Sequence, residues 1–189
     1  MSRDDWLFDG GRRATAAERI YAMATELIVR DGMDAFSIDA LAARTHCSRA
    51  TIYRYVGGKK EIRDAVLART AARIIETVRS SVEGRAGPER VLTAIEAAVA
   101  EIRDDPMGGL FLESARGGGW TWLTTSPVVA DFATELTGLA GDDATAARWI
   151  VRLVLSLLFW PDADPRAEHQ MLQRFVAPAF AESGGAQSS

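Results

Sequence analysis

The sequence has few of the residues that metal sites, disulfides and nucleophilic catalysis require. Its 189 residues include one cysteine, Cys47, and two histidines, His46 and His169. A single cysteine excludes an internal disulfide, and no second His or Cys stands at the spacing of metal ligands. A Gly-x-Ser-x-Gly motif and a phosphate-binding Gly-rich loop are also missing from the sequence. We therefore expect a protein that is not an enzyme and that uses no cofactor and no metal.

Long apolar segments are missing as well. The longest nearly continuous apolar run, from Trp149 to Trp160, is interrupted by Arg152 and Ser156. It falls short of the roughly 18–20 residues that a membrane span needs. The chain does not open with a charged and then apolar signal segment. These features predict a cytoplasmic protein.

The sequence also lacks the alternation of apolar and polar residues that is typical of a half-buried strand. Apolar residues instead recur at helical spacing along most of the chain, and Gly and Pro stand between the periodic segments. The sequence therefore predicts an all-α fold of about nine helices.

Residues 37–60, SIDALAARTHCSRATIYRYVGGKK, predict two short helices joined by a tight turn. Ser37 suits the N-cap of a helix over 38–45, and Ser48 suits the N-cap of a second helix that begins at Arg49 and ends at 55 or 56. The spacing is typical of a helix-turn-helix, in which two helices cross steeply. The residues at the expected apolar contacts between them are Leu41, Ala42, Cys47, Ile52 and Val56.

The outward face of the second helix is polar and basic. With Ile52 and Val56 turned inward, the helical period leaves Arg49, Ala50, Tyr53 and Arg54 outside, with Thr51 at the edge. From Ala40 to Lys60 there are five basic residues and no acidic one. A slender helix with such a face suits the major groove of DNA. The alternative is a solvated face on an ordinary helical hairpin.

Residues 37–62 resemble the DNA-binding signature of the TetR family of bacterial transcriptional regulators. That signature reads Ser-basic-x-Thr-aliphatic-Tyr-x-aromatic-aromatic, followed by Lys and an acidic residue, and this chain has SRATIYRYV followed by GGKKEI. The resemblance implies base-edge positions for Arg49, Ala50 and Arg54. The remaining expected DNA-binding residues, most of them phosphate contacts, are Ser37, Ser48, Thr51, Tyr53, Tyr55 and Lys59.

Two positions depart from the family pattern. His46 stands where the family has a turn glycine, and Val56 stands where it has a bulky aromatic residue. Histidine tolerates a left-handed conformation better than most residues other than glycine, so the turn remains allowed. Val56 leaves less apolar volume behind the second helix.

The chain before this motif is expected to hold one further helix. Residues 1–14 are polar and Gly-containing, and we interpret them as a flexible arm that is either loose or lies in a minor groove. Thr15 and Glu18 have the spacing of a capping box, which predicts the start of a helix that ends at Gly32. The inward stripe of this helix is expected to be Ile20, Ala24, Leu27 and Ile28.

The predicted domains differ in charge. The first 60 residues carry ten Lys/Arg and eight Asp/Glu, whereas the remainder carries twelve and eighteen. A basic DNA-binding end on an acidic body orients approach to a polyanion. The expected divisions are the arm 1–14, a helix-turn-helix domain 15–58, a helical regulatory and dimerisation domain 59–182 that begins with a connector helix 59–83, and a disordered tail 183–189.

Large apolar residues gather in the second half of the sequence. Core packing explains any one of them, but together with a Gly-Gly-Gly hinge at 117–119 they suit an apolar ligand cavity. The resemblance likewise implies a ligand pocket in this half. We expect the effector to be a hydrophobic small molecule bound by Met107, Phe111, Trp120, Trp122, Phe132 and Trp149.

The run from Trp149 to Trp160 is apolar nearly all round, which indicates burial on several sides. We therefore expect a homodimer formed through residues 142–160 and 166–180, with Pro178 bending or shortening the last helix. The sequence predicts a ligand-responsive repressor that is released from an inverted-repeat operator. The alternatives are a helix-turn-helix regulator without an effector, and a helical ligand carrier or enzyme in which the hairpin is structural.

Overall fold

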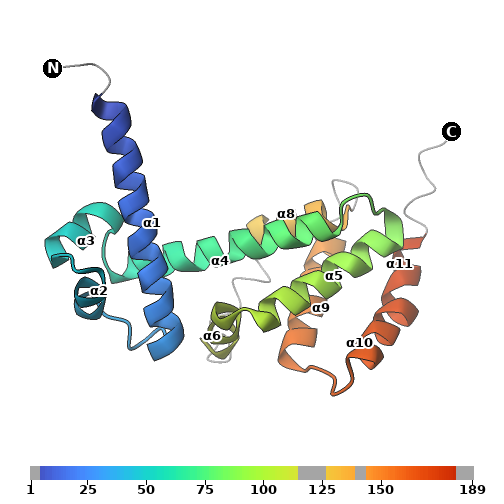
Figure 1. Ribbon diagram of the computed structural model, residues 1–189. Coiled ribbons are helices and arrows are strands. Elements are labelled where there is room, and N and C mark those ends of the chain that lie inside the picture. The colour runs from blue at the N-terminus through green and yellow to red at the C-terminus, as the bar shows by residue number, and fades with distance from the viewer. Residues whose placement is uncertain (1–4, 115–126, 139–143, 182–189) are drawn as a thin grey trace. The chain divides into compact units, whose positions relative to one another are not determined.

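The structure, a computed structural model, describes residues 5–114, 127–138 and 144–181 (Figure 1). Every regular element in these ranges is a helix, which confirms the all-α prediction for this part of the chain. None of the described helices is long and apolar enough to cross a membrane. The chain divides into two compact units, Met1–Ala71 and Ala72–Ser189.

The first unit consists of α1 (Asp5–Asp31), α2 (Ile38–Thr45), α3 (Arg49–Val56) and the first half of α4 (Lys59–Ser81) (Figure 1). The helix α1 ends as predicted, because Gly32 adopts a φ of 88° and its N–H donates to the carbonyl of Ile28 at 2.8 Å. The predicted stripe of α1 is buried, and the core of this unit comprises Ile20, Ala24, Leu27, Ile28, Phe36, Ile38, Leu41, Ile52, Val56, Ile62 and Val66.

The helix α1 begins ten residues earlier than the capping box predicts. Residues 5–14, interpreted from sequence as part of a flexible arm, belong to the helix Asp5–Asp31. The two glycines in this stretch cost about 1 kcal/mol each in a helix interior, which a helix of this length can absorb. A capping box matters only where preceding residues are not helical, since only there do backbone N–H groups lack partners. The start at Thr15 is therefore wrong.

The boundary between the units lies within α4, and not at the glycines 57 and 58 where the sequence predicts it. Ile62 and Val66, in the first half of α4, are fully buried. Arg69 reaches α1, where its two Nη atoms donate to the carboxylate of Glu18 at 2.6 Å and its guanidinium lies 4.2 Å from the ring centroid of Tyr21. These contacts assign the start of the connector to the first unit.

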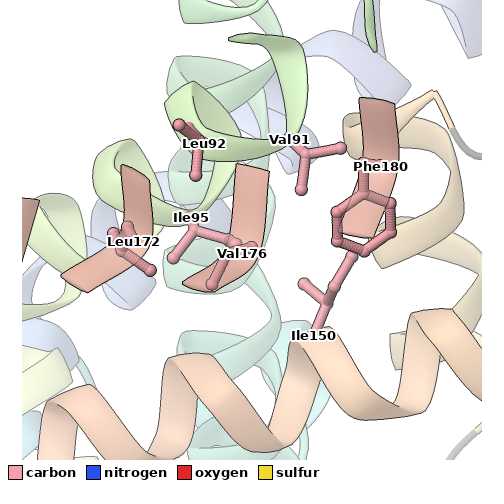
Figure 2. Packing of buried hydrophobic residues seen from close by; sticks show 7 residues of the cluster. All are labelled: Val91, Leu92, Ile95, Ile150, Leu172, Val176 and Phe180. Carbon is pink, nitrogen blue, oxygen red and sulfur yellow. The ribbon is translucent and has the colours of Figure 1, made fainter. Parts of the chain in front are cut away.

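The second unit holds the rest of α4 with α5 (Gly87–Asp104), α6 (Pro106–Ser114), α8 (Pro127–Thr137) and α9 (Ala144–Phe159). A smaller cluster packs α4 against α5 and α8 through Val78, Val82, Ala94 and Leu136. Figure 2 shows the larger cluster, in which α5 and α9 meet the C-terminal helical segment through Val91, Leu92, Ile95, Ile150, Leu172, Val176 and Phe180.

The C-terminal segment is continuous but not regular. It consists of α10 (Pro165–Met171), a π-helical stretch (Leu172–Val176) and α11 (Ala177–Ala181). The sequence predicts that Pro178 bends or shortens this helix, and the structure has a wider turn directly before it. The N–H of Ala177 donates to the carbonyl of Leu172, five residues back. A proline lacks the N–H that a regular helix would use, and a π-helical turn rearranges the preceding bonds.

Helices α5 and α6 approach each other closely at their junction. Asp105 begins α6, since its Oδ1 accepts from the N–H groups of Met107 at 2.7 Å and Gly108 at 3.1 Å. A Cβ added to Gly108 would lie 2.2 Å from the carbonyl oxygen of Ile102. Asp105 also forms an ion pair with Arg73 of α4. The predicted hinge 117–119 and tail 183–189 lie outside the described residues.

Candidate nucleic-acid interface

Two serines begin the helices of the predicted helix-turn-helix. Ser37 has extended backbone angles, and its Oγ accepts from the N–H of Ala40 at 3.2 Å. The Oγ of Ser48 accepts from the N–H of Thr51 at 3.0 Å and lies 2.8 Å from the hydroxyl of Thr51. Both N-caps are as predicted. The hydroxyls of Ser48 and Thr51 are thereby fixed at the start of α3.

The turn between α2 and α3 depends on a left-handed residue. His46 adopts φ 53° and ψ 34°, the conformation that the family's glycine would adopt without strain. The N–H of Cys47 donates to the carbonyl of Ala42 at 3.1 Å, which closes the turn. Cys47 itself is half-buried, and its thiol lies 3.5 Å from the carbonyl oxygen of Thr45. Histidine at this position therefore adopts the left-handed conformation that the turn requires.

Helix α3 has one buried and one exposed face. Ile52 is fully buried and Val56 nearly so, whereas the ring of Tyr53 is 56% exposed. Thr51 and Tyr55 are half-buried at the edges of the helix. The other exposed residues are Ser48, Arg49, Ala50 and Arg54, so the structure brings the predicted base-edge residues to one exposed face.

The basic side chains of α3 are held by neighbours. The guanidinium of Arg49 forms two bonds with the carboxylate of Asp39 on α2, from Nε to Oδ1 at 2.6 Å and from Nη2 to Oδ2 at 2.6 Å. The guanidinium of Arg54 lies 5.1 Å from the ring centroid of Tyr55. Arg44, on α2, pairs with Glu26 of α1 at 3.3 Å. The sequence reasoning missed Asp39, one residue outside the acid-free stretch.

Lys59 has a contact that the sequence does not predict. Its ammonium donates to the backbone carbonyl of Asp34, in the α1–α2 loop, at 2.9 Å. An ammonium has three donors, so this bond leaves capacity for a phosphate. The turn before it is fixed by Gly57, with φ 82°, and by the N–H of Gly58, which donates to Oε2 of Glu61 at 3.0 Å.

The residues predicted to bind a ligand lie in the second unit and have different surroundings. Met107 is buried, Phe132 is half-buried and Trp149 is exposed, with its ring centroid 6.2 Å from that of Phe180. The side chain of Phe111 and the residues Trp120 and Trp122 lie outside the described part of the chain. Of the described three, none lines the pocket between α5, α9 and the C-terminal segment.

That pocket has a volume of about 260 Å³ and a mixed lining. It lies between α5, α9 and the C-terminal segment, and its walls carry charged as well as apolar groups. The lining residues are Glu96, Val99, Ala100, Arg103, Leu157, Glu168, His169 and Leu172.

An ion pair between a partly exposed arginine and a buried carboxylate joins three helices at this pocket. Arg103 on α5 donates to both carboxylate oxygens of Glu168 on α10, at 2.9 and 2.8 Å, and to the carbonyl of Leu157 on α9 at 2.8 Å. The N–H of Asp162 donates to the same carboxylate at 3.0 Å. The hydrogen bonds from Arg103 lower the pKa of Glu168, against the opposing effect of burial. They raise the pKa of Arg103. No sequence signal links Arg103 with a residue 65 positions away.

Large apolar side chains are exposed on α9 and on the C-terminal segment. Phe175 is 67% exposed and Trp160, just after α9, is 74% exposed. Trp149 and Met171 are exposed to a lesser extent. Large apolar side chains at a surface favour burial against a partner. They lie on the two segments from which the sequence predicts a dimer.

Comparison with known sequences places this helix-turn-helix among bacterial regulators. Residues 20–66 match the model of a family described as bacterial regulatory proteins, tetR family. An uncharacterised HTH-type transcriptional regulator of Mycobacterium tuberculosis is 30% identical over 193 residues, which cover 98% of this chain and 95% of that protein. The DNA-binding transcriptional repressor TetR of Mycobacteroides abscessus is 41% identical over 56 residues, or 30% of each chain.

Solved structures share the fold. The TetR family repressor AlkX of Dietzia sp. has a TM-score of 0.54 at 18% identity, with 86% of this chain and 94% of that one covered. The repressor QsdR of R. erythropolis has a TM-score of 0.51 at 18% identity, with 84% and 90% covered. At this identity the likeness concerns the fold alone.

Proposed function

Because the chain belongs to the TetR family of bacterial regulatory proteins, we propose that it is a repressor that binds an inverted-repeat operator as a homodimer and leaves it on binding a hydrophobic small molecule. Family membership makes the chain a DNA-binding transcriptional regulator, and regulators of this family act as dimers. The observation that carries the proposal is the exposed face of α3.

The contacts of α3 with DNA divide into two kinds. Residues at the start of a recognition helix reach base edges in the major groove, and Arg49 and Ala50 stand at this start. Arg54, in the last turn of α3, is the third residue proposed to lie near base edges. The exposed ring of Tyr53 and the ammonium of Lys59 would contact phosphates, which fix the orientation without reading sequence. Ser37 and Thr51 are the other proposed phosphate contacts, and Ser48 and Tyr55 complete the proposed DNA-binding residues.

The homodimer would form through residues 142–160 and 166–180. The exposure of Trp149, Trp160, Met171 and Phe175 supports this proposal, because large apolar side chains at a surface favour burial against a partner. A two-fold dimer presents two copies of α3, and an operator for such a dimer is an inverted repeat.

A hydrophobic effector is supported by the aromatic residues of the second unit, with Met107, Phe132 and Trp149 among the candidates. The Dietzia repressor of similar fold is implicated in biodegradation of n-alkanes, which are hydrophobic molecules. A coupling of about 1–3 kcal/mol between effector and DNA would change DNA affinity by about 5- to 150-fold. By linkage, DNA would weaken effector binding by the same factor.

The test of DNA reading is selection of duplexes from a randomised pool by the full-length protein, followed by binding measurements at several salt concentrations. Arg49→Ala should relax the preference at one position per half-site and cost about 1–3 kcal/mol. Tyr53→Phe and Lys59→Ala should weaken all duplexes evenly. Lys60→Ala, which removes an exposed charge paired with Asp64, is the matched control. Unchanged base preference in Arg49→Ala would show that α3 does not read the operator.

The effector is tested with a panel of n-alkanes and aromatic hydrocarbons, added to the protein bound to the selected duplex. We expect release of DNA and a change in tryptophan fluorescence, with Phe132→Ala reducing both. A panel that alters neither signal would favour the regulator without a small-molecule effector.

A further inference from the structure

The ion pair between Asp39 and Arg49 lies on the surface that would face DNA, and it joins the starts of two helices. Asp39 is the second residue of α2 and Arg49 is the first residue of α3. Their side chains are 66% and 64% exposed, although both bonds between them measure 2.6 Å. Exposed pairs of this kind contribute little to folding stability. Its consequence is expected in DNA recognition, so the inference rests on the proposed function.

The geometry of the pair leaves one edge of the guanidinium available. Arginine has five N–H donors in a planar fork. The carboxylate of Asp39 takes the side edge, formed by Nε and Nη2. The end edge, formed by one N–H of Nη1 and the second N–H of Nη2, points away from Asp39. Two parallel donors of this kind match O6 and N7 of guanine in the major groove.

The negative charge of Asp39 also favours a contact between Arg49 and a base over a contact between Arg49 and a phosphate. A free arginine at this position could turn to a phosphate, a contact that carries no sequence information. The fork-to-fork pair restrains the guanidinium, and the carboxylate repels a phosphate that approaches the same edge. The pair also orders the long side chain of Arg49 before DNA binds, so that less conformational entropy is lost on binding.

We propose that Asp39 is a specificity-determining residue, which holds Arg49 with its end edge toward a guanine and keeps it from the phosphates. Asp39 touches no base in this proposal and acts through Arg49. It lowers affinity for DNA of arbitrary sequence while it supports reading of one base pair in each half-site.

The experiment compares two duplexes: the sequence that the wild-type protein selects from a randomised pool, and a scrambled duplex of equal length. Asp39→Asn should lower the ratio of their affinities about fivefold, which corresponds to the upper end of the energy of an exposed ion pair. The loss should come mainly from tighter binding to the scrambled duplex. A repeated selection with Asp39→Asn should relax the same guanine position that Arg49→Ala relaxes.

Three controls separate this effect from general ones. Glu26→Gln removes another exposed acid that pairs with an arginine of α2, and it should leave the affinity ratio unchanged. In the Arg49→Ala background, Asp39→Asn should no longer change the ratio. Asp39→Ser, which keeps a residue suited to the start of a helix, should behave as Asp39→Asn does, and circular dichroism verifies that each variant is folded.

The outcomes are distinct. An unchanged ratio in Asp39→Asn and Asp39→Ser, or an equal fall with and without Arg49, would overturn the role of Asp39 and leave the proposed function intact. A wild-type protein that selects no consensus from the pool would overturn both.

Discussion

The two units of the chain expose opposite kinds of surface. The first unit exposes basic and hydroxyl side chains on α3, and several of its exposed acids pair with arginines, as in Asp39–Arg49. The second unit exposes large apolar side chains such as Trp160 and Phe175, and in its Arg103–Glu168 ion pair the carboxylate is buried. A polar, basic surface suits a polyanion such as DNA, and such binding weakens as salt is added. An apolar surface suits another protein surface, and such binding does not weaken with salt. The two surfaces can therefore be disrupted separately.

The largest expected effect concerns the core of the second unit. Phe180 is buried among Val91, Ile150 and Val176 (Figure 2). Phe180→Ala should lower the free energy of unfolding by about 3–5 kcal/mol, because it removes apolar burial and leaves a cavity. Chemical denaturation measures the change, and Ala179→Gly, at an exposed neighbour, is the control. A loss below about 1 kcal/mol would contradict the packing in Figure 2.

The next effect separates assembly from folding. Phe175→Glu places a charge on the exposed apolar surface, and truncation of a hot-spot residue near the centre of an interface costs about 2 kcal/mol or more of binding. We expect a folded monomer at micromolar concentration by analytical ultracentrifugation. Gln173→Glu adds the same charge at a neighbouring exposed residue and should be milder. A Phe175→Glu protein that remains as dimeric as the wild type would exclude this face from the interface.

The third effect concerns the Arg103–Glu168 pair, whose carboxylate is buried, unlike the carboxylates of the exposed pairs in the first unit. Glu168→Gln should destabilise the protein by about 1.5–3 kcal/mol at neutral pH, since Arg103 loses a charged hydrogen-bond partner. The folded state lowers the pKa of Glu168, so its contribution is present above the ordinary value of 4.5 and is lost as the pH falls through the lowered value. Thermal unfolding from pH 7 to pH 3 should show a smaller pH effect in the variant. Glu26→Gln, from an exposed pair in the first unit, should change stability by no more than about 0.5 kcal/mol.

The smallest effect concerns the turn of the first unit. His46 has positive φ, where glycine is unstrained. His46→Gly should therefore stabilise the protein by up to about 1 kcal/mol, and His46→Val should destabilise it, because β-branched residues adopt this conformation poorly. Denaturation midpoints of the three proteins give the order. A glycine variant less stable than the wild type would mean that the histidine side chain contributes more than its backbone costs.

Sequence reasoning succeeded where structure depends on nearby residues. The N-caps at Ser37 and Ser48, the turn at His46 and the burial of Ile52 follow from local hydrogen bonding and helical period. It failed at the start of α1, because a capping box does not reveal whether the preceding residues are already helical.

Long-range pairs could not be predicted from the sequence. The partners of Arg49, Lys59 and Arg103 depend on the angle at which helices cross and on the path of a loop. The helical period fixes the face on which a side chain lies, but it does not fix which residue of another helix lies opposite. The position of the boundary between the two units within α4 could not be predicted for the same reason, since it depends on which helices cover Ile62 and Val66.

The close approach of α5 and α6 restricts which sequences can keep this fold. A side chain at Gly108 would collide with the backbone carbonyl of Ile102, which no rotamer can relieve, whereas a Cβ at the adjacent Gly109 meets nothing within 4 Å. In a library that replaces each residue in turn, position 108 should accept glycine alone and position 109 should accept alanine. The two adjacent glycines thus differ in the substitutions that they tolerate, because only Gly108 lies where the backbones of two helices touch.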